Sequence, residues 1–148
     1  MSDVHFYFAG GGPYLASFRK EVPQNMFLLG KIPKSEVEEF LAAGDLFVHP
    51  SGLDALPTTV VEASVMEKPI VASNIGGISE IVKNNVTGYL CKVDDTEQWV
   101  ERIRFVLDNP SVGKKLGQNA RKYVTEKFDW QKIVKAFLQK LKELNLSR

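Results

Sequence analysis

The chain has 148 residues, enough for one domain, with hydrophobic and charged shares of 44% and 25% that are typical of a soluble globular protein. A net charge of +1 argues against a nucleic-acid-binding surface. No apolar run approaches the roughly 20 residues of a membrane span, and Met1–Gly10 has no signal-peptide pattern. The single cysteine, Cys91, excludes an internal disulfide and favours a reducing compartment.

Short apolar runs alternate with helical patterns along the chain. Strands are expected at Val4–Ala9, Met26–Leu29, Asp45–His49, Pro69–Ser73 and Tyr89–Val93. Helices are expected at Tyr14–Lys20, Glu36–Ala43, Pro57–Met66, Gly77–Val82, residues 96–107, Val112–Lys127 and Trp130–Leu144. Candidate caps are Ser35, with Glu38 completing a capping box, then one of residues 94–96, and Asp129.

The strands are continuous apolar runs separated by helices, a pattern that favours a parallel sheet covered on both faces. The predicted fold class is therefore α/β, with one doubly wound parallel sheet. In such a sheet, ligands bind beyond the carboxyl ends of the strands. The loops at those ends are Gly10–Pro13, Gly30–Pro33, Pro50–Pro57 and Asn74–Ser79.

Residues 45–80 contain the loop with the most suggestive chemistry. Asp54 follows an apolar strand, and Glu62 comes eight positions later, one helical turn beyond Thr58. The hydroxyls and N–H groups of Thr58 and Thr59, at the start of a helix, could meet a phosphate, and the two carboxylates could accept hydrogen bonds from sugar hydroxyls. Three other interpretations stay open: the glycine-rich loops are tight turns, Asp54 is an ordinary turn acid, and Glu62 has a backbone or arginine partner.

Other kinds of site are not supported. Gly10–Gly12 is not a dinucleotide fingerprint, because no G-x-G-x-x-G follows a strand, and no Walker A lysine pattern exists. The two histidines, His5 and His49, are far apart without a supporting cluster, so each is expected to end a strand rather than to bind a metal. The apolar stripe from Ile133 to Leu144 is expected to be a packing face rather than a lipid or partner site.

Four segments carry a recognisable set of motifs in a fixed order: Asp45–Ser51, Asp54–Ala63, Lys68–Ser73 and Gly76–Val82. Further motifs are Gly10–Pro13, Gly88–Leu90, Gly117–Arg121 and Phe128–Trp130. Together they resemble the nucleotide-binding half of the group 1 retaining glycosyltransferases, over nearly the whole chain. Enzymes of that family have the GT-B fold, two Rossmann-like domains with the active site between them. The resemblance implies that residues 1–148 form the donor-binding, or nucleotide-sugar-binding, domain and that the acceptor-binding domain is absent from this chain.

The resemblance also implies a role for each matched position. Asp54 matches the first acid of the family's Glu-x7-Glu motif and would contact the donor sugar; Glu62 matches the second and would bind the ribose hydroxyls. These two are the expected catalytic residues. The other expected donor-binding residues are Leu56, Pro57, Thr58 and Thr59 facing the diphosphate, Lys31 and Ile32 framing the base, and Gly11 and Gly12 at the cleft edge. The family works without a bound metal, so no metal or other cofactor is expected, and the chain has no Asp-x-Asp.

The sequence departs from the family pattern in two ways. Asp54 stands where glutamate is usual and is one methylene shorter, so we expect altered sugar preference or weaker donor binding. The family's domain normally begins with a further strand and helix, whose Arg and Lys neutralise the diphosphate, and no such segment precedes Val4. Without those cations the departing phosphate loses stabilisation, so we expect the isolated chain to be inactive.

The expected gap would lie at the centre of the sheet, so either the flanking strands pair directly or a partner chain fills it, as in a homodimer. In the intact enzyme the expected function is transfer of a hexose, such as mannose or glucose, from a nucleoside-diphosphate sugar to an acceptor with retention of configuration. The alternatives are a non-catalytic sugar-nucleotide-binding module and one subunit of a split transferase. The expected location is the cytoplasm, with any contact to the inner face of the membrane made through the missing half.

Overall fold

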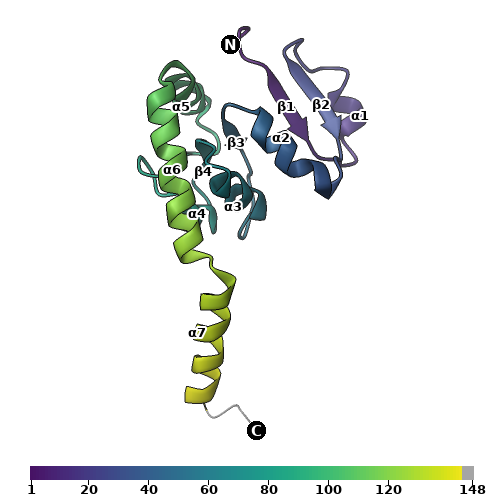
Figure 1. Cartoon of the computed structure of the whole chain (residues 1–148). Helices are drawn as coiled ribbons and strands as arrows, with labels where there is room; N and C mark the ends of the chain where they lie inside the picture. Colours follow the sequence, from purple (N-terminus) through teal and green to yellow (C-terminus); the bar gives the residue numbers. More distant parts are fainter. Residues whose placement is uncertain (145–148) are drawn as a thin grey trace. The chain divides into compact units, whose positions relative to one another are not determined.

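A computed structural model of the chain describes residues 1–144. The paired strands are parallel and alternate with helices, so the predicted α/β class is confirmed. The chain divides into two compact units, Met1–Phe40 and the residues from Leu41 onward (Figure 1). Among the described residues the parallel strands pair as two sheets, β1 with β2 and β3 with β4 and β5, where the sequence favoured one doubly wound sheet. Direct pairing of the strands that flank the expected gap, one of the two alternatives, is not seen among residues 1–144.

The first unit carries a two-stranded sheet and buries little. Its elements are β1 (Phe6–Ala9), α1 (Leu15–Phe18), β2 (Met26–Gly30) and the 3-10 helix η1 (Lys34–Glu36). Tyr7 and Phe27 are opposite each other in the register and stack with ring centroids 4.8 Å apart, yet both side chains are exposed. Among residues 1–40 only Gly30 is buried, because two short strands offer few positions that can be covered.

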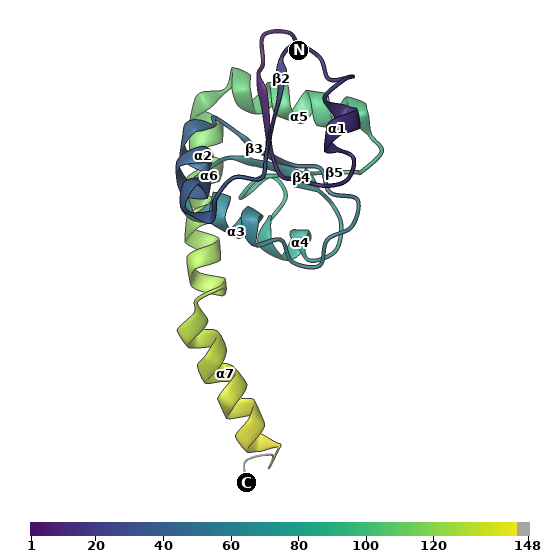
Figure 2. The same ribbon diagram turned by 90° about the vertical axis from the view of Figure 1, so that its right-hand side faces the viewer.

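The second unit contains the hydrophobic core. Its strands are β3 (Phe47–His49), β4 (Ile70–Ser73) and β5 (Tyr89–Cys91). Its helices are α3 (Thr58–Val65), α4 (Ile78–Ile81), α5 (Thr96–Asp108), α6 (Pro110–Lys127) and α7 (Trp130–Glu143). Helix α2 (Val37–Ala43) spans the boundary between the two units. β4 lies between β3 and β5, and all four of its residues are buried. Figure 2 shows α5 on one side of this sheet and α3 and α4 on the other. Coverage of both faces explains why β4 is a continuous apolar run.

A glycine sets the distance between α6 and the end of α3. A Cβ built on Gly117 would lie 1.9 Å from the carbonyl oxygen of Glu67, which no side chain can tolerate. Glu67 follows α3 with a φ of 58°, the left-handed conformation that ends many helices. The guanidinium of Arg121 on α6 lies 3.2 Å from the Glu67 carboxylate. Two residues of the motif Gly117–Arg121 therefore hold α6 against the end of α3.

Several predicted boundaries and caps differ from the structure. β1 begins at Phe6 rather than Val4, and β3 at Phe47 rather than Asp45. The capping box at Ser35 is wrong, because Ser35 lies inside η1, which begins after Pro33 and has no side-chain cap. The caps of the two later helices are at Asp95, whose Oδ1 accepts from the Gln98 N–H at 3.0 Å, and at Asp129, as predicted.

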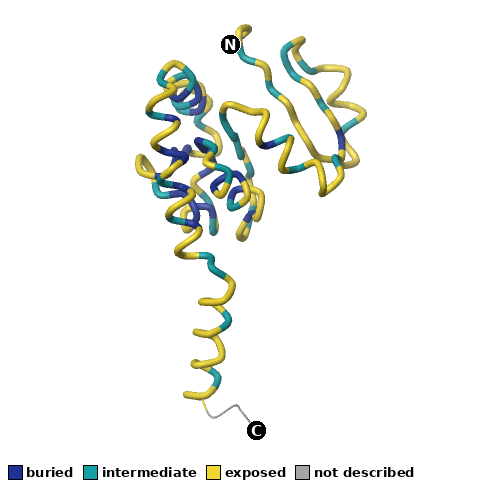
Figure 3. Tube along the Cα trace, viewed as in Figure 1, coloured by how far each residue is buried: buried dark blue, intermediate teal, exposed yellow. Residues whose placement is uncertain are grey.

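Helix α7 is amphipathic but has no buried residue (Figure 3). Its apolar side chains include Trp130, Phe137 and Leu138, which are 74%, 62% and 51% exposed. The expected packing face is therefore uncovered within residues 1–144. No helix in that range combines the length and the apolar character that a membrane crossing requires.

Candidate functional site

The loop between β3 and α3, residues 50–57, is held in place by the Gly76-Gly77 turn that follows β4. The Gly77 N–H donates to the carbonyl of Ala55 at 2.7 Å. A Cβ on Gly76 would lie 2.0 Å from the carbonyl oxygen of Asp54, and a Cβ on Gly77 would lie 2.0 Å from that of Ala55. Gly76 also has a φ of 46°, which favours glycine. The two loops at the carboxyl ends of β3 and β4 are thus packed backbone against backbone.

The carboxylate of Asp54 is paired with the last residue of β3. Its Oδ2 lies 3.1 Å from Nε2 of His49, and the side chains of His49 and Asp54 are 19% and 27% exposed. Among the described residues, Oδ1 of Asp54 has no hydrogen-bond partner. Asp54 is therefore half-buried and oriented, with one oxygen left for another donor.

The N-terminus of α3 presents unsatisfied backbone N–H groups. Pro57 is buried at the N-cap and has no side-chain capping bond, while Thr58 and Thr59 in the first turn are exposed. The Val60 N–H donates to the Pro57 carbonyl at 3.2 Å, so the N–H groups of the two threonines before it are the open ones. Leu56, just before the helix, is 46% exposed. The open N–H groups and the helix dipole favour an anion at this position.

Glu62 lies one turn further along α3. Its apolar neighbours Val60 and Ala63 are fully buried and Val61 is half-buried, but Glu62 itself is exposed. Its carboxylate makes no hydrogen bond or ion pair with any residue of 1–144, so the arginine or backbone partner considered from the sequence is not present. The reason is geometric: the buried residues of α3 lie on one face of the helix and Glu62 on the opposite one. Its carboxylate is free to bind a ligand.

The expected residues of the first unit gather at the ends of β1 and β2. The Gly10 N–H donates to the Gly30 carbonyl at 2.7 Å, which brings the two loops side by side. A Cβ on Gly11 would lie 3.1 Å from Cγ of Lys31, whereas Gly12 has open space around it. Lys31 is exposed and Ile32 is half-buried. Gly11, Gly12, Lys31 and Ile32 therefore form one group in this unit, and Asp54, Leu56, Pro57, Thr58, Thr59 and Glu62 form another in the second unit.

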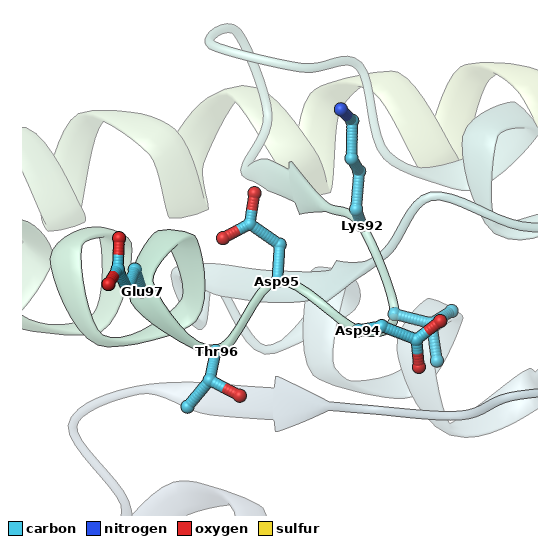
Figure 4. A pocket seen from close by; sticks show the side chains of 6 residues that line it. Lys92, Asp94, Asp95, Thr96 and Glu97 are labelled. Carbon is cyan, nitrogen blue, oxygen red and sulfur yellow. The ribbon is translucent and has the colours of Figure 1, made fainter.

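Two surface hollows lie elsewhere on the chain. One, of about 540 Å³, is lined by Lys92–Glu97 at the start of α5, and one carboxylate there, Asp95, is already used to cap the helix (Figure 4). The other, of about 480 Å³, runs along α7 from Gln131 to Lys142. Neither includes Asp54 or Glu62. No group of three or more metal-ligating side chains is found within the described residues.

Cys91 is not available as a nucleophile. It is fully buried on β5, and burial raises the pKa of its thiol to about 11 from the ordinary 9.0, against the opposing effect of the nearby Arg102 charge. The thiolate is therefore a minor species at neutral pH.

Sequence reasoning missed the supporting role of three residues. His49 was expected only to end a strand, and Gly76 and Gly77 were matched to a motif without a contact. The five-residue separation of His49 and Asp54 across a turn at Pro50 was the available signal for the pair. Nothing in the sequence pairs Gly76 with Asp54, because their contact depends on the adjacency of β3 and β4.

Comparisons with known proteins agree with this architecture. The family model described as glycosyl transferases group 1 matches residues 1–123. The chain is 33% identical over 111 residues to a glycogen synthase of Mycobacterium tuberculosis, covering 75% of the chain and 27% of that protein. It is 28% identical over 147 residues to an uncharacterized glycosyltransferase of Methanocaldococcus jannaschii, covering 97% of the chain and 42% of the relative.

A solved structure has the same fold. The Anabaena protein HepE, crystallised in complex with UDP-glucose, superimposes with a TM-score of 0.85 at 21% identity, over 97% of this chain and 42% of that one. The chain thus spans about a quarter to two fifths of the length of these proteins. Because the family model covers most of the sequence, the chain belongs to the glycosyl transferases of group 1.

Proposed function

We propose that this chain binds the donor of a retaining glycosyltransferase, a nucleoside-diphosphate sugar whose hexose, such as glucose or mannose, the intact enzyme transfers to an acceptor. The observation that carries the proposal is the grouping in one unit of two accessible carboxylates, Asp54 and Glu62, with the open N-terminus of α3 between them in the chain. Within residues 1–144, each has an oxygen without a partner that can accept a hydrogen bond from a hydroxyl.

The start of α3 suits a diphosphate. The N–H groups of Thr58 and Thr59 are open and their hydroxyls are exposed. Several N–H donors and the positive end of a helix dipole stabilise an anion by charge-assisted hydrogen bonds. The negative charge that develops on the diphosphate as the sugar departs would be stabilised by the same groups.

The two acids suit the hydroxyl-bearing ends of the same ligand. Glu62 has no competing partner among residues 1–144 and would accept hydrogen bonds from the ribose hydroxyls. Asp54 has one oxygen free and would accept a hydrogen bond from the hexose. For Lys31, Ile32, Gly11 and Gly12, which all belong to the first unit, the roles that the family resemblance implies stay predictions.

We assign donor binding to this chain and sugar transfer to the intact enzyme, because the relatives that the chain matches are more than twice its length. No metal is needed in the proposed binding mode, because backbone N–H groups serve the phosphates. We therefore propose that a chelator leaves nucleotide binding unchanged and that the isolated chain shows no sugar transfer.

Titration calorimetry tests the proposal directly. UDP and GDP are compared with their 2′,3′-dideoxy forms, using the chain in chelator-treated buffer. We expect one of the two nucleotides to bind and its dideoxy form to bind about tenfold more weakly, as loss of a hydrogen bond to a charged group predicts. Failure of both nucleotides to bind would contradict the proposal, and so would equal affinity for the dideoxy form.

A further inference from the structure

The pairing of His49 with Asp54 fixes a side chain that a loop alone would leave free to rotate. His49 ends β3 opposite Ala72, and its carbonyl accepts a hydrogen bond from the Ser73 hydroxyl at 3.4 Å. Its ring lies at 19° to that of Phe47, with centroids 6.1 Å apart. Residues of β3 and β4 thus contact His49, and Nε2 of its ring lies 3.1 Å from Oδ2 of Asp54.

The chemistry of the pair assigns the proton. An ionised carboxylate only accepts hydrogen bonds, so Nε2 of His49 must carry hydrogen, either as the Nε2–H tautomer or in the imidazolium. Oδ2 is then occupied and Oδ1 remains open. Asp54 presents one acceptor oxygen with a set direction, and a ligand that uses it does not have to order the side chain first.

The backbone and the side chain of Asp54 are held by different residues. Gly76 and Gly77 contact the loop through the carbonyls of Asp54 and Ala55. The hydrogen bond from the His49 ring is made to the carboxylate of Asp54 instead. Removal of the His49 hydrogen bond should therefore free the side chain and leave the loop in place.

We propose that His49 is a positioning residue that aims Asp54 at the hexose of the donor and so helps to set sugar affinity. This inference rests on the proposed function, because it takes Asp54 as the acid that meets the sugar. It assigns to His49 an effect on the sugar alone, since the nucleotide is bound by the other groups of the site.

The binding experiment uses His49→Phe, which keeps a ring beside Phe47 but has no Nε2, and His49→Gln, whose amide can donate from a similar position. His5→Gln is the matched control, because His5 contacts Phe27 in the first unit. Each protein is titrated with UDP and UDP-glucose and with GDP and GDP-mannose, and the pair whose nucleotide binds is used.

In His49→Phe we expect the sugar nucleotide to bind about tenfold more weakly, as the loss of one charge-assisted hydrogen bond suggests, with the bare nucleotide unchanged within about twofold. His49→Gln should recover part of the loss. Equal losses for nucleotide and sugar nucleotide would overturn the inference, and so would no loss, or a wild-type chain that does not distinguish the two ligands. If the wild-type chain binds no nucleotide at all, the proposed function fails first.

A spectroscopic measurement reports the pair without any ligand. The chain has two histidines, so His5→Gln leaves only the His49 imidazole signal in 15N NMR. In the His5→Gln chain we expect Nε2 of His49 to carry the proton when the ring is neutral. We expect this preference to weaken in the double variant that also carries Asp54→Leu. An Nδ1–H tautomer in the chain with Asp54 intact would show that the pair is not formed and would overturn the inference.

Discussion

Asp54 and Glu62 are eight positions apart and are held in place in opposite ways. Asp54 lies in a loop whose backbone is fixed by Gly76 and Gly77 and whose carboxylate is fixed by His49. Glu62 lies on α3, where Val60 and Ala63 are buried on the opposite face, and its carboxylate makes no hydrogen bond or ion pair within the described chain. The backbone of the loop acid thus depends on a contact with a distant turn and its carboxylate on a residue five positions earlier, whereas the helix acid depends on the burial of the opposite helix face.

This difference has a consequence for mutation. A change at a residue distant in sequence can displace Asp54 without touching it, whereas Glu62 should be insensitive to everything except the integrity of α3. Four substitutions test these two kinds of support.

The largest effect is expected for Gly76→Ala. The new methyl group would meet the Asp54 carbonyl at 2.0 Å, in a backbone conformation with φ of 46°, so the loop or the turn must move. We expect the free energy of unfolding to fall by about 2–3 kcal/mol, from overpacking together with backbone strain. Urea denaturation measures it. Gly52→Ala is the control, because a Cβ there meets nothing within 4 Å; equal stability of the two variants would show that the loop contact is not tight.

Gly117→Ala tests the close approach of α6 to the end of α3. The added methyl group would meet the Glu67 carbonyl at 1.9 Å and push α6 away from the end of α3. Alanine improves helix propensity by up to about 1 kcal/mol, so we expect a net loss of roughly 1–2 kcal/mol in urea denaturation. Gly113→Ala, where the nearest atom is Val106 Cγ1 at 3.3 Å, should show at most a small loss. A Gly117→Ala chain as stable as wild type would contradict the close approach.

Glu62→Gln should separate binding from folding. The carboxylate is exposed and unpaired in the described structure, so stability should stay within about 0.5 kcal/mol of wild type. Nucleotide affinity should fall about tenfold, because the charged acceptor for the ribose hydroxyls is lost. Calorimetry with the dideoxy nucleotide should show no further loss. Glu126→Gln, at an exposed acid on α6, controls for the change in net charge. If Glu126→Gln lowered nucleotide affinity as much as Glu62→Gln does, Glu62 would have no specific role in binding.

Asp54→Glu is expected to have the smallest effect. The side chain gains one methylene while the loop stays fixed by Gly76 and Gly77, so the carboxylate must shift relative to His49. We expect sugar-nucleotide affinity to change by about two- to fivefold, the size of a weakened rather than a lost hydrogen bond, with nucleotide affinity unchanged. In the intact enzyme the preference between sugars should change as well. Unchanged affinity and unchanged turnover would show that the length of this side chain does not matter.

Local patterns in the sequence predicted much of the fold. The apolar runs at β2 and β4 and the periodic helices α5 and α6 lie within a few residues of their expected positions. The motif from Asp45 to Val82 identified the family, which the family match confirms. The capping box at Ser35 failed because the preceding Pro33 and the 3-10 turn at Lys34 supplied a different start.

The candidate site was predicted only in part. The sequence placed Asp54 in a loop and Glu62 on a helix, since both assignments depend on neighbours within a few positions. It did not predict that Glu62 would be exposed and unpaired, nor that His49 would bind Asp54.

The sequence by itself determined which residues form strands and helices, because hydrophobic periodicity and turn residues act over short distances along the chain. Only the tertiary structure decided how Asp54 is held and how the strands divide into two sheets. The contact between Gly76 and Asp54 joins residues that are separated by α3 and β4, and it exists because β3 and β4 pair side by side. Such contacts depend on the packing of whole elements, which no local pattern records.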